Sequence, residues 1–356
     1  MTAPTPRSHD QAGFTLVELL VSMTILTIIM GATLTAFTHA MRANDAAILM
    51  LGANENLRTG LDLMVRDFTQ VGQGLPTSKV IAIPSGVGAT AIVRPGPPGR
   101  NYTLPLDATE ITAVTPGAGL GLNMITDRGV DTGVPTDIVT IIYADSQFVD
   151  IDGNPPQCTP SADGSSMTVS IAAQIENGDL IMFTNSMPNG SAIQTVTRHS
   201  GTPPNQTAYF DAGDPLNLNQ RGAEDGTIIQ LQSGPGVYPA TTASRIRMVT
   251  YYVDSRREPT QLVRCLNAEC VVDPNGRRTV AFGMENLQLS YDLVDGVTNP
   301  ADVKDPASPN LNQIRKVNIF LAVRSRHRFT VTGQCFRNSI ATQVSLRSLS
   351  FVDRYR

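Results

Sequence analysis

An apolar run near the N-terminus constrains the fold of this chain more than any other feature. From Phe14 to Ala36 there are 23 residues, and Glu18 is the only charged one among them. A helix rises 1.5 Å per residue, so this run would be about 35 Å long, enough to cross a hydrocarbon core of about 30 Å. We therefore predict a transmembrane helix over residues 14–37.

The polar segment that precedes this run is short. In a secretory signal peptide the apolar region lies before the cleavage site, and small residues close it. Here the polar segment, residues 1–13, lies ahead of the apolar run. Cleavage after Gly13 would therefore remove a leader and leave the apolar helix on the mature protein as an anchor.

Glu18 is unusual because a carboxylate at the centre of a membrane helix costs about 2.5–3.5 kcal/mol on insertion scales. Such a residue is a functional candidate, and its partner would be a cation in the same layer. Cleavage after Gly13 would create one, the α-amine of Phe14, about one helical turn away. Between parallel subunits offset by one turn, Glu18 of one chain would meet the amine of the next. The alternative is a plain signal anchor with a stray Glu.

The segment G-F-T-L-V-E-L-L-V, residues 13–21, resembles the cleavage and methylation segment of type IV prepilins and type II secretion pseudopilins. In that family a prepilin peptidase cuts after the residue that matches Gly13 and methylates the residue that matches Phe14. The residue that matches Glu18 is needed for assembly. The leader departs from the family pattern, because Arg7 is balanced by Asp10 and belongs to no basic cluster.

An apolar stripe continues the helix beyond the membrane. Its members step by four, three, four and three residues, which is the spacing of one helical face: Leu57, Leu61, Met64, Phe68 and Val71. Gly72, Gly74 and Pro76 end the pattern. We predict that residues 38–74 form the amphipathic half of one long helix and pack this stripe against a globular head, residues 75–356.

The run of residues 53–72 resembles two particular subfamilies of these proteins. It is similar to the second half of the first helix in PilW-type minor pilins, with matches at Arg58, Leu61, Asp62, Leu63, Arg66 and Asp67. GspJ-type pseudopilins of the type II secretion system carry a similar pattern, so this run leaves both subfamilies open.

The head is predicted to be rich in strands. Only 16% of the residues are charged, and Thr, Ser, Asn, Gly and Pro are frequent, as in extracytoplasmic β-rich proteins. Residues 75–133 suggest short strands and long loops. Short apolar or alternating runs then predict strands at 137–144, 178–184, 227–232, 245–253, 287–293 and 317–323. The expected fold class is α+β, with the long helix packed on a large antiparallel sheet whose other face meets solvent. The order of the strands resembles the PilW head, and the class is therefore type IV pilin-like.

Four cysteines suggest disulfides in an exported domain. Cys265 and Cys270 flank four residues, and a four-residue hairpin loop would place them opposite each other. Cys158 and Cys335 would then pair by elimination, although four cysteines allow three connectivities. A metal site is disfavoured, because no C-x-x-C pair or nearby His accompanies them.

The remaining polar motifs favour structural roles. Arg324, Arg326 and Arg328 alternate around His327 and would share one strand face, which indicates a solvated or edge-protecting face more than a site for nucleic acid or an acidic partner. Residues 150–154 have the oxygen density of a calcium loop but lack the Glu of an EF-hand, so an Asp-Gly turn is preferred and structural calcium is the alternative.

Catalysis and cofactors are not indicated. The sequence contains no H-E-x-x-H, G-x-S-x-G or S-x-x-K motif, and its four histidines are scattered. A net charge of −4 gives no reason to expect affinity for nucleic acid or for an anionic membrane. We expect no enzyme activity and no cofactor.

The resemblance implies a minor pilin of a type IV pilus that acts in assembly, in priming or at the filament tip. Its partners would be the prepilin peptidase, other minor and major pilins, the inner-membrane assembly platform and a large tip adhesin. It would begin as a single-pass inner-membrane precursor with a periplasmic head and end in the pilus at the cell surface. The alternatives are a GspJ-like pseudopilin, a tip adhesin that binds through residues 75–133 or 186–226, and a membrane-tethered enzyme.

Overall fold

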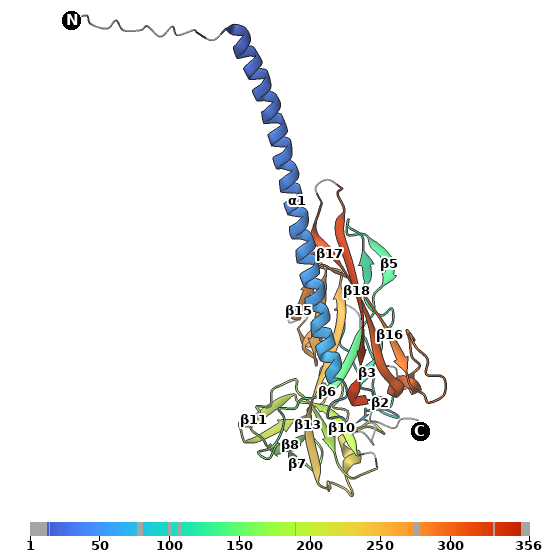
Figure 1. The fold of residues 1–356 in the computed structure, drawn as a ribbon. Coiled ribbons are helices and arrows are strands. Elements are labelled where there is room, and N and C mark those ends of the chain that lie inside the picture. Colours follow the sequence, from blue (N-terminus) through green and yellow to red (C-terminus); the bar gives the residue numbers. More distant parts are fainter. Residues whose placement is uncertain are drawn as a thin grey trace, which may run out of the picture.

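One long helix and a β-rich head make up the structure (Figure 1). The computed structural model describes residues 13, 15–76, 81–98, 102–104, 108–188, 190–273, 278–329 and 332–349. Helix α1 spans Leu16–Gln70, 55 residues without interruption. Its first half projects away from the head, and its second half lies against it. The predicted α+β, type IV pilin-like class is confirmed.

The end of α1 is fixed on the head by backbone contacts. Val71 leaves the helical conformation, and Gly72 follows with a φ of +77°, a value that favours glycine. The N–H of Gly72 donates to the carbonyl of Ile142 at 3.0 Å. The glycine therefore stops the helix where the chain turns onto the sheet.

A three-stranded antiparallel sheet covers one side of the second half of α1. Its order is β16 (Met284–Leu293), β17 (Ile314–Arg328) and β18 (Cys335–Ser345). Alternate residues of these strands point to the helix, which is why Leu287, Leu289, Val317, Ile319, Leu321 and Val323 share one hydrophobic core with α1.

A thirteen-stranded sheet forms the rest of the head, and it is antiparallel except where β1 meets β10. Its strands are β1 (Ile81–Ala82), β2 (Glu110–Ile111), β3 (Val114–Thr115), β6 (Val139–Ala144), β7 (Gln157–Pro160), β8 (Ser166–Ser170), β9 (Leu180–Thr184), β10 (Ser191–Thr195), β11 (Arg198–Thr202), β12 (Asn205–Tyr209), β13 (Thr241–Asp254), β14 (Gln261–Leu266) and β15 (Arg278–Phe282). A separate hairpin pairs β4 (Asn123–Ile125) with β5 (Asp131–Pro135). The short helices are α2 (Glu269–Val272), η1 (Ile228–Leu231), η2 (Ser308–Gln313) and η3 (Arg347–Leu349).

Strand β13 joins two lobes of the head. Residues 246–254 pair with β6 and β14 beside α1, whereas residues 241–246 pair with β7 and β9. We name the second region the distal lobe, residues 157–240, which has a hydrophobic core of its own. The distal lobe lies beyond the C-terminal end of α1 (Figure 1).

Two details of the strand prediction are wrong. The strand predicted at 227–232 is instead the 3₁₀ helix η1 (Ile228–Leu231), because Ile228 and Leu231 are spaced three apart and both enter the distal core. The strand predicted from Asp137 begins at Val139. The Asp137 carboxylate instead accepts the N–H groups of Gly119 at 2.8 Å and Leu289 at 2.7 Å, and so ties two segments together.

Candidate functional site

The candidate cleavage and assembly segment lies at the start of α1. Thr15 has an extended backbone and is the N-cap residue of the helix. Gly13 is exposed, and Phe14 lies outside the described residues. The helix therefore begins at Leu16, three residues after Gly13 and within the segment of residues 13–21, with Glu18 in its first turn.

Thr15 and Glu18 form a capping box, which the sequence analysis missed. The N–H of Glu18 donates to Oγ1 of Thr15 at 3.3 Å, while the N–H and hydroxyl of Thr15 donate to Oε2 of Glu18 at 3.4 and 3.3 Å. This pattern satisfies donors that a helix start leaves without partners, and T-x-x-E is its sequence signal. Within the described residues Oε1 of Glu18 accepts no bond, so the carboxylate retains capacity for a donor from another chain.

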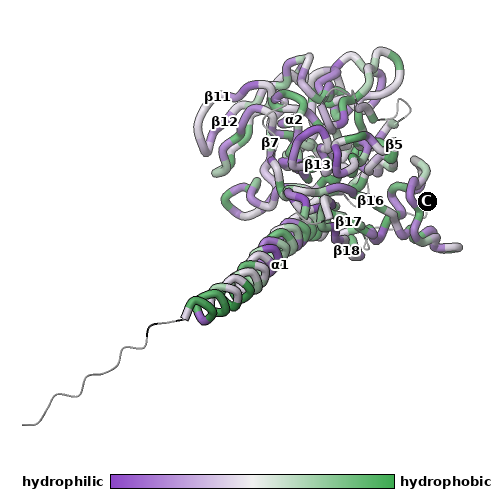
Figure 2. Tube along the Cα trace, turned by 90° about the horizontal axis from the view of Figure 1, so that it is seen from above, coloured by the Kyte–Doolittle hydropathy of each residue, from purple (hydrophilic) through white to green (hydrophobic). Residues whose placement is uncertain are grey.

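The first half of α1 exposes apolar surface on all sides. The large apolar side chains from Leu16 to Met41 are exposed, and the window that could span a membrane has no buried residue. Figure 2 shows this hydrophobic stretch at the end of the helix farthest from the head. An exposed apolar surface of this size requires lipid or other protein helices to cover it.

Hydroxyl groups within this apolar half are satisfied by the helix itself. Their Oγ atoms donate to carbonyls three or four residues earlier, at 2.6–2.9 Å, from Ser22, Thr24, Thr27, Thr33, Thr35 and Thr38. A membrane core offers no water to such groups, so internal bonding lowers the cost of inserting them. Glu18 is then the distinctive polar group of the span.

The predicted packing stripe lies in the core of the head. Leu57, Leu61, Met64, Phe68 and Val71 are buried and contact the sheet of β16, β17 and β18 through one cluster. Gly60 lies within the same face. A Cβ at Gly60 would stand 2.8 Å from Cε of Met284, so this glycine lets α1 approach the head closely.

A buried polar cluster fixes α1 on the head. The carboxylate of Asp67 accepts the hydroxyl of Tyr251 at 2.6 Å and Nε of Arg264 at 2.7 Å. Asp67 is 4% exposed. Burial and the neighbouring Asp67 carboxylate raise the pKa of Tyr251, whereas the bond to Asp67 raises the pKa of Arg264 against the opposing effect of burial. The cluster helps to set the rotation of the helix, together with the bonds that Asn54 and Asn56 make to Asn338 and Phe282. In the sequence, Asp67 contributed only to the resemblance; its position beside Phe68 on the stripe side was the available signal for its role in packing.

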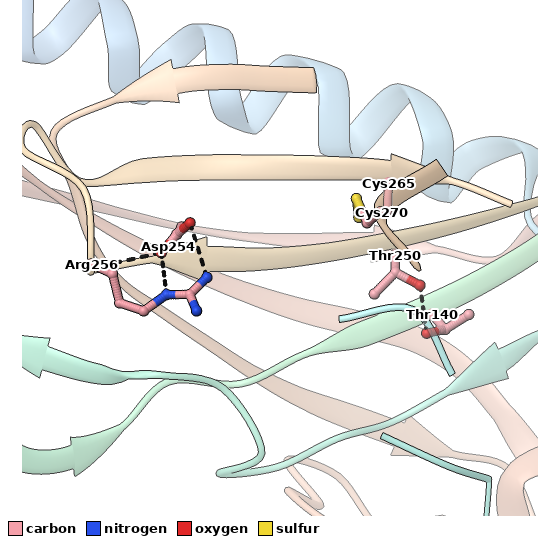
Figure 3. The surroundings of a disulfide bond; sticks show 6 residues. All are labelled: Thr140, Thr250, Asp254, Arg256, Cys265 and Cys270. Atoms are coloured by element: carbon pink, nitrogen blue, oxygen red, sulfur yellow. Dashed lines mark hydrogen bonds and ion pairs between the residues drawn. A yellow bond between two sulfur atoms is a disulfide. The ribbon is translucent and has the colours of Figure 1, made fainter. Parts of the chain in front are cut away.

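The disulfide between Cys265 and Cys270 lies directly after Arg264 (Figure 3). The two Cα atoms are 5.6 Å apart. The predicted hairpin is wrong: Cys270 belongs to the helical turn α2, and the strand that pairs with β14 is β15. Both cysteines belong to a small buried cluster that includes Tyr252 and Val263.

The second predicted bridge is not formed. Cys158 lies in β7 and is buried in the distal core, where burial raises its pKa to about 12. Cys335 begins β18, and burial together with the Asp127 carboxylate raises its pKa. The two cysteines belong to opposite ends of the head (Figure 1), so pairing by elimination fails.

The arginines of β17 do not share one face, contrary to the prediction. Arg324 is 3% exposed and donates to the carbonyl of Thr126 at 2.9 Å and to Glu258 at 2.8 Å. Arg326, His327 and Arg328 are exposed. The alternation fails because the pairing of β17 with β18 shifts register between Arg324 and Arg328.

Residues 150–154, which resemble a calcium loop in sequence, form a turn that the side chain of Asp150 stabilises. Oδ1 of Asp150 accepts the N–H groups of Asp152 and Asn154, both at 2.9 Å, and Gly153 has a φ of +81°. Within the described ranges, no three side chains of His, Cys, Asp or Glu gather as a metal site would need. Structural calcium therefore gains no support from this geometry.

Comparison with known proteins identifies the N-terminal segment. Residues 8–34 match the family of the prokaryotic N-terminal methylation motif. No curated protein and no solved structure gives a significant match. The motif and the long apolar helix on an antiparallel β head together define a type IV pilin- or pseudopilin-like protein. The chain is thus prepilin-like, which indicates processing by a prepilin peptidase and other pilins as partners, and its apolar helix fits anchoring by a single membrane span.

Proposed function

We propose that this protein is a PilW-type minor pilin that acts in the assembly or priming of a type IV pilus or at its tip. The observation that carries the proposal is Glu18, held in the first turn of an uncovered apolar helix next to the motif. Such a subunit acts by binding and not by catalysis.

The geometry of the helix start supports the following assembly step. Cleavage after Gly13 creates the α-amine of Phe14, which the peptidase methylates. A methylated amine keeps its positive charge at neutral pH. The amine of one chain then pairs with Glu18 of its neighbour, since Oε1 of Glu18 accepts no bond within the described part of its own chain. In this ion pair the two opposite charges neutralise each other within the apolar filament core, and the pair fixes the offset between subunits.

The distal lobe favours a position at the tip. The anchor end of α1 faces the membrane, so the opposite end of the molecule points outward along a growing filament. The distal lobe occupies this outward end, beyond the last turn of α1 (Figure 1). It would obstruct a subunit stacked above it. The subunit at the tip has no subunit above it, so the distal lobe would obstruct nothing there. The further partners would be minor and major pilins, the inner-membrane assembly platform and a large tip adhesin.

A GspJ-like pseudopilin is the second candidate, because the same motif and helix serve that class equally well. A tip adhesin is the third, and the β11–β12 hairpin of the distal lobe favours it. All five residues of β11 are exposed, and the guanidinium of Arg198 stacks over the ring of Tyr209 at 3.7 Å.

Mass spectrometry of sheared surface filaments, beside the membrane fraction, tests the proposal. A peptide that begins at methylated Phe14 and is found in the filaments supports the minor-pilin function. The same peptide found only in membranes favours a pseudopilin or a primer that stays at the base. An intact leader in cells that assemble filaments would refute the prepilin assignment itself.

A further inference from the structure

The β17–β18 hairpin extends along α1 toward the apolar half of the helix (Figure 1). Arg326 and His327 line a groove of about 560 Å³ together with Ile48 and Leu49 of α1. Beyond this contact the hairpin stays closed, because the N–H of Phe329 donates to the carbonyl of Gln334 at 2.8 Å. We name residues 326–329 and 332–335 the hairpin end.

The position of the hairpin end relative to the membrane follows from chain dimensions. The apolar run ends near Phe37, and Ile48 lies eleven residues later, about 16 Å along the helix. From Arg326 to Phe329 an extended strand advances about 10 Å. When α1 spans a bilayer, Phe329 therefore lies about 6 Å from the hydrocarbon core, within the headgroup layer, and Arg326 about 16 Å from the core.

The hairpin end and the turn beside it are basic. Arg326 and Arg328 are exposed, and so is Arg128 in the turn between β4 and β5. The turn is held there because the guanidinium of Arg328 donates to the carbonyl of Asp127. Arg128 and Arg326 make no ion pair within the described part of the chain.

The carboxylates in this region are already paired. Asp127 and Glu285 both bind Arg337, and Glu258 binds Arg324. On α1, His39 and Arg42 follow the apolar run, with Asp45 one turn later. This end of the head is therefore cationic, although the whole chain carries a net charge of −4. The net charge conceals the local distribution on which binding depends.

We propose that the hairpin end docks on anionic lipid headgroups of the bilayer that holds α1. Guanidinium groups bind phosphate oxygens through paired hydrogen bonds, and basic segments next to a membrane span are attracted to anionic lipids. The contact fixes the tilt of the head before assembly and is broken when the subunit leaves the membrane. The inference rests on the membrane anchoring proposed above.

A single tryptophan tests the contact, because the chain contains none. The full-length Phe329→Trp protein is placed in nanodiscs of neutral lipid or of a neutral and anionic mixture, each with lipid brominated near the headgroup. We expect a blue shift and stronger quenching of the emission in the anionic discs, and a loss of this difference at high salt. Equal emission in the two lipids, or no quenching in either, would overturn the proposal.

Charge variants separate docking from mere proximity. The double variant Arg326→Gln, Arg328→Gln should abolish the stronger quenching in anionic discs relative to neutral ones. Arg128→Gln, in the turn between β4 and β5, should do the same in a protein whose β17 is unchanged. Arg198→Gln, an exposed arginine of the distal lobe, should change nothing. Quenching that survives in both sets of arginine variants contradicts electrostatic docking. A second reporter, Val237→Trp at an exposed position of the distal lobe, should not be quenched.

The failure of this inference is distinguishable from failure of the proposed function. Recovery of the protein with the discs reports anchoring, and methylated Phe14 in filaments reports the pilin function. A Phe329→Trp protein that is anchored and assembles normally, but whose tryptophan emission does not respond to lipid charge, refutes the docking alone. A protein that does not remain with the discs refutes the anchoring, and the docking with it.

Discussion

Two carboxylates on α1 illustrate how the surroundings of a residue assign its role. Glu18 lies in an exposed apolar segment and is bonded only to Thr15 within the described chain. Asp67 lies 49 positions later in the same helix, buried between Arg264 and Tyr251. The first is exposed and can meet a partner outside the chain, whereas the second is buried and bonded inside it. Substitutions at the two sites should therefore affect different properties.

Replacing Glu18 should affect assembly and leave the head folded. Glu18→Ala removes an acceptor whose charge-assisted bond contributes about 1.5–3 kcal/mol, so incorporation into filaments should fall about 10- to 100-fold. The measurement is the ratio of filament to membrane protein by immunoblot. Glu55→Ala, at an exposed position on the same helix, is the matched control. Normal incorporation of Glu18→Ala would remove Glu18 from the assembly site.

Replacing Asp67 should destabilise the head. Asp67→Ala leaves the guanidinium of Arg264, whose side chain is only 15% exposed, without its carboxylate, and breaking a buried pair costs about 3 kcal/mol. Urea unfolding of the full chain in detergent measures the loss. Asp62→Ala, on the exposed side of α1, should change stability by less than about 0.5 kcal/mol. Equal effects of the two substitutions would show that the Asp67 cluster does not hold the helix.

At the scale of elements, periodicity was sufficient for the helix and for strands with strict alternation. The apolar span and the stripe from Leu57 to Val71 predicted one continuous helix, since both follow a helical period. The alternation of 287–293 and 317–323 predicted β16 and β17. The local pattern failed after Arg324, where a register shift breaks the alternation of β17, and at η1, whose apolar residues suit a strand or a 3₁₀ turn equally.

Long-range partners were beyond the reach of the sequence. The buried cluster at Asp67 depends on residues almost 200 positions away, and nothing in the sequence near Asp67 identifies them. The disulfide was predicted because its cysteines are close in sequence, whereas the pairing of Cys158 with Cys335 assumed a proximity that the two lobes prevent. The methylation motif was predictable because it is a short contiguous pattern.

Two glycines of α1 offer a matched test of helix packing. At Gly52 a Cβ meets no atom within 4 Å, so Gly52→Ala should stabilise the protein by up to about 1 kcal/mol through helix propensity. At Gly60 the same change forces Met284 and Leu262 aside, and the cost of about 1–3 kcal/mol outweighs that gain. Thermal unfolding of both variants measures the difference. The same sign of change at both positions would contradict the close packing at Gly60.

At the scale of the whole molecule, one half of α1 carries the anchor and the other half carries the head. The apolar half is uncovered, so its burial must come from the surroundings of the protein. We expect the full chain to resist extraction from membranes by carbonate.

Ile28→Asp should weaken this anchoring, because a carboxylate at the centre of a membrane helix costs about 2.5–3.5 kcal/mol. The measurement is the fraction of protein that floats with membrane vesicles. Ile28→Leu keeps the apolar character and should leave the fraction unchanged. Equal flotation of the two variants would indicate that residues 14–37 do not span the bilayer.

Strand β13 determines how the molecule would carry tension. A pull between the membrane anchor and a ligand on the distal lobe would act along this strand, which runs from one lobe to the other (Figure 1). Its neighbours β6, β9 and β14 lie alongside, so their ladders would be loaded in shear and many hydrogen bonds would have to break together. A hairpin pulled open from its end breaks them one at a time. The shared strand therefore makes the connection between the lobes mechanically strong along the direction from the anchor to the distal lobe.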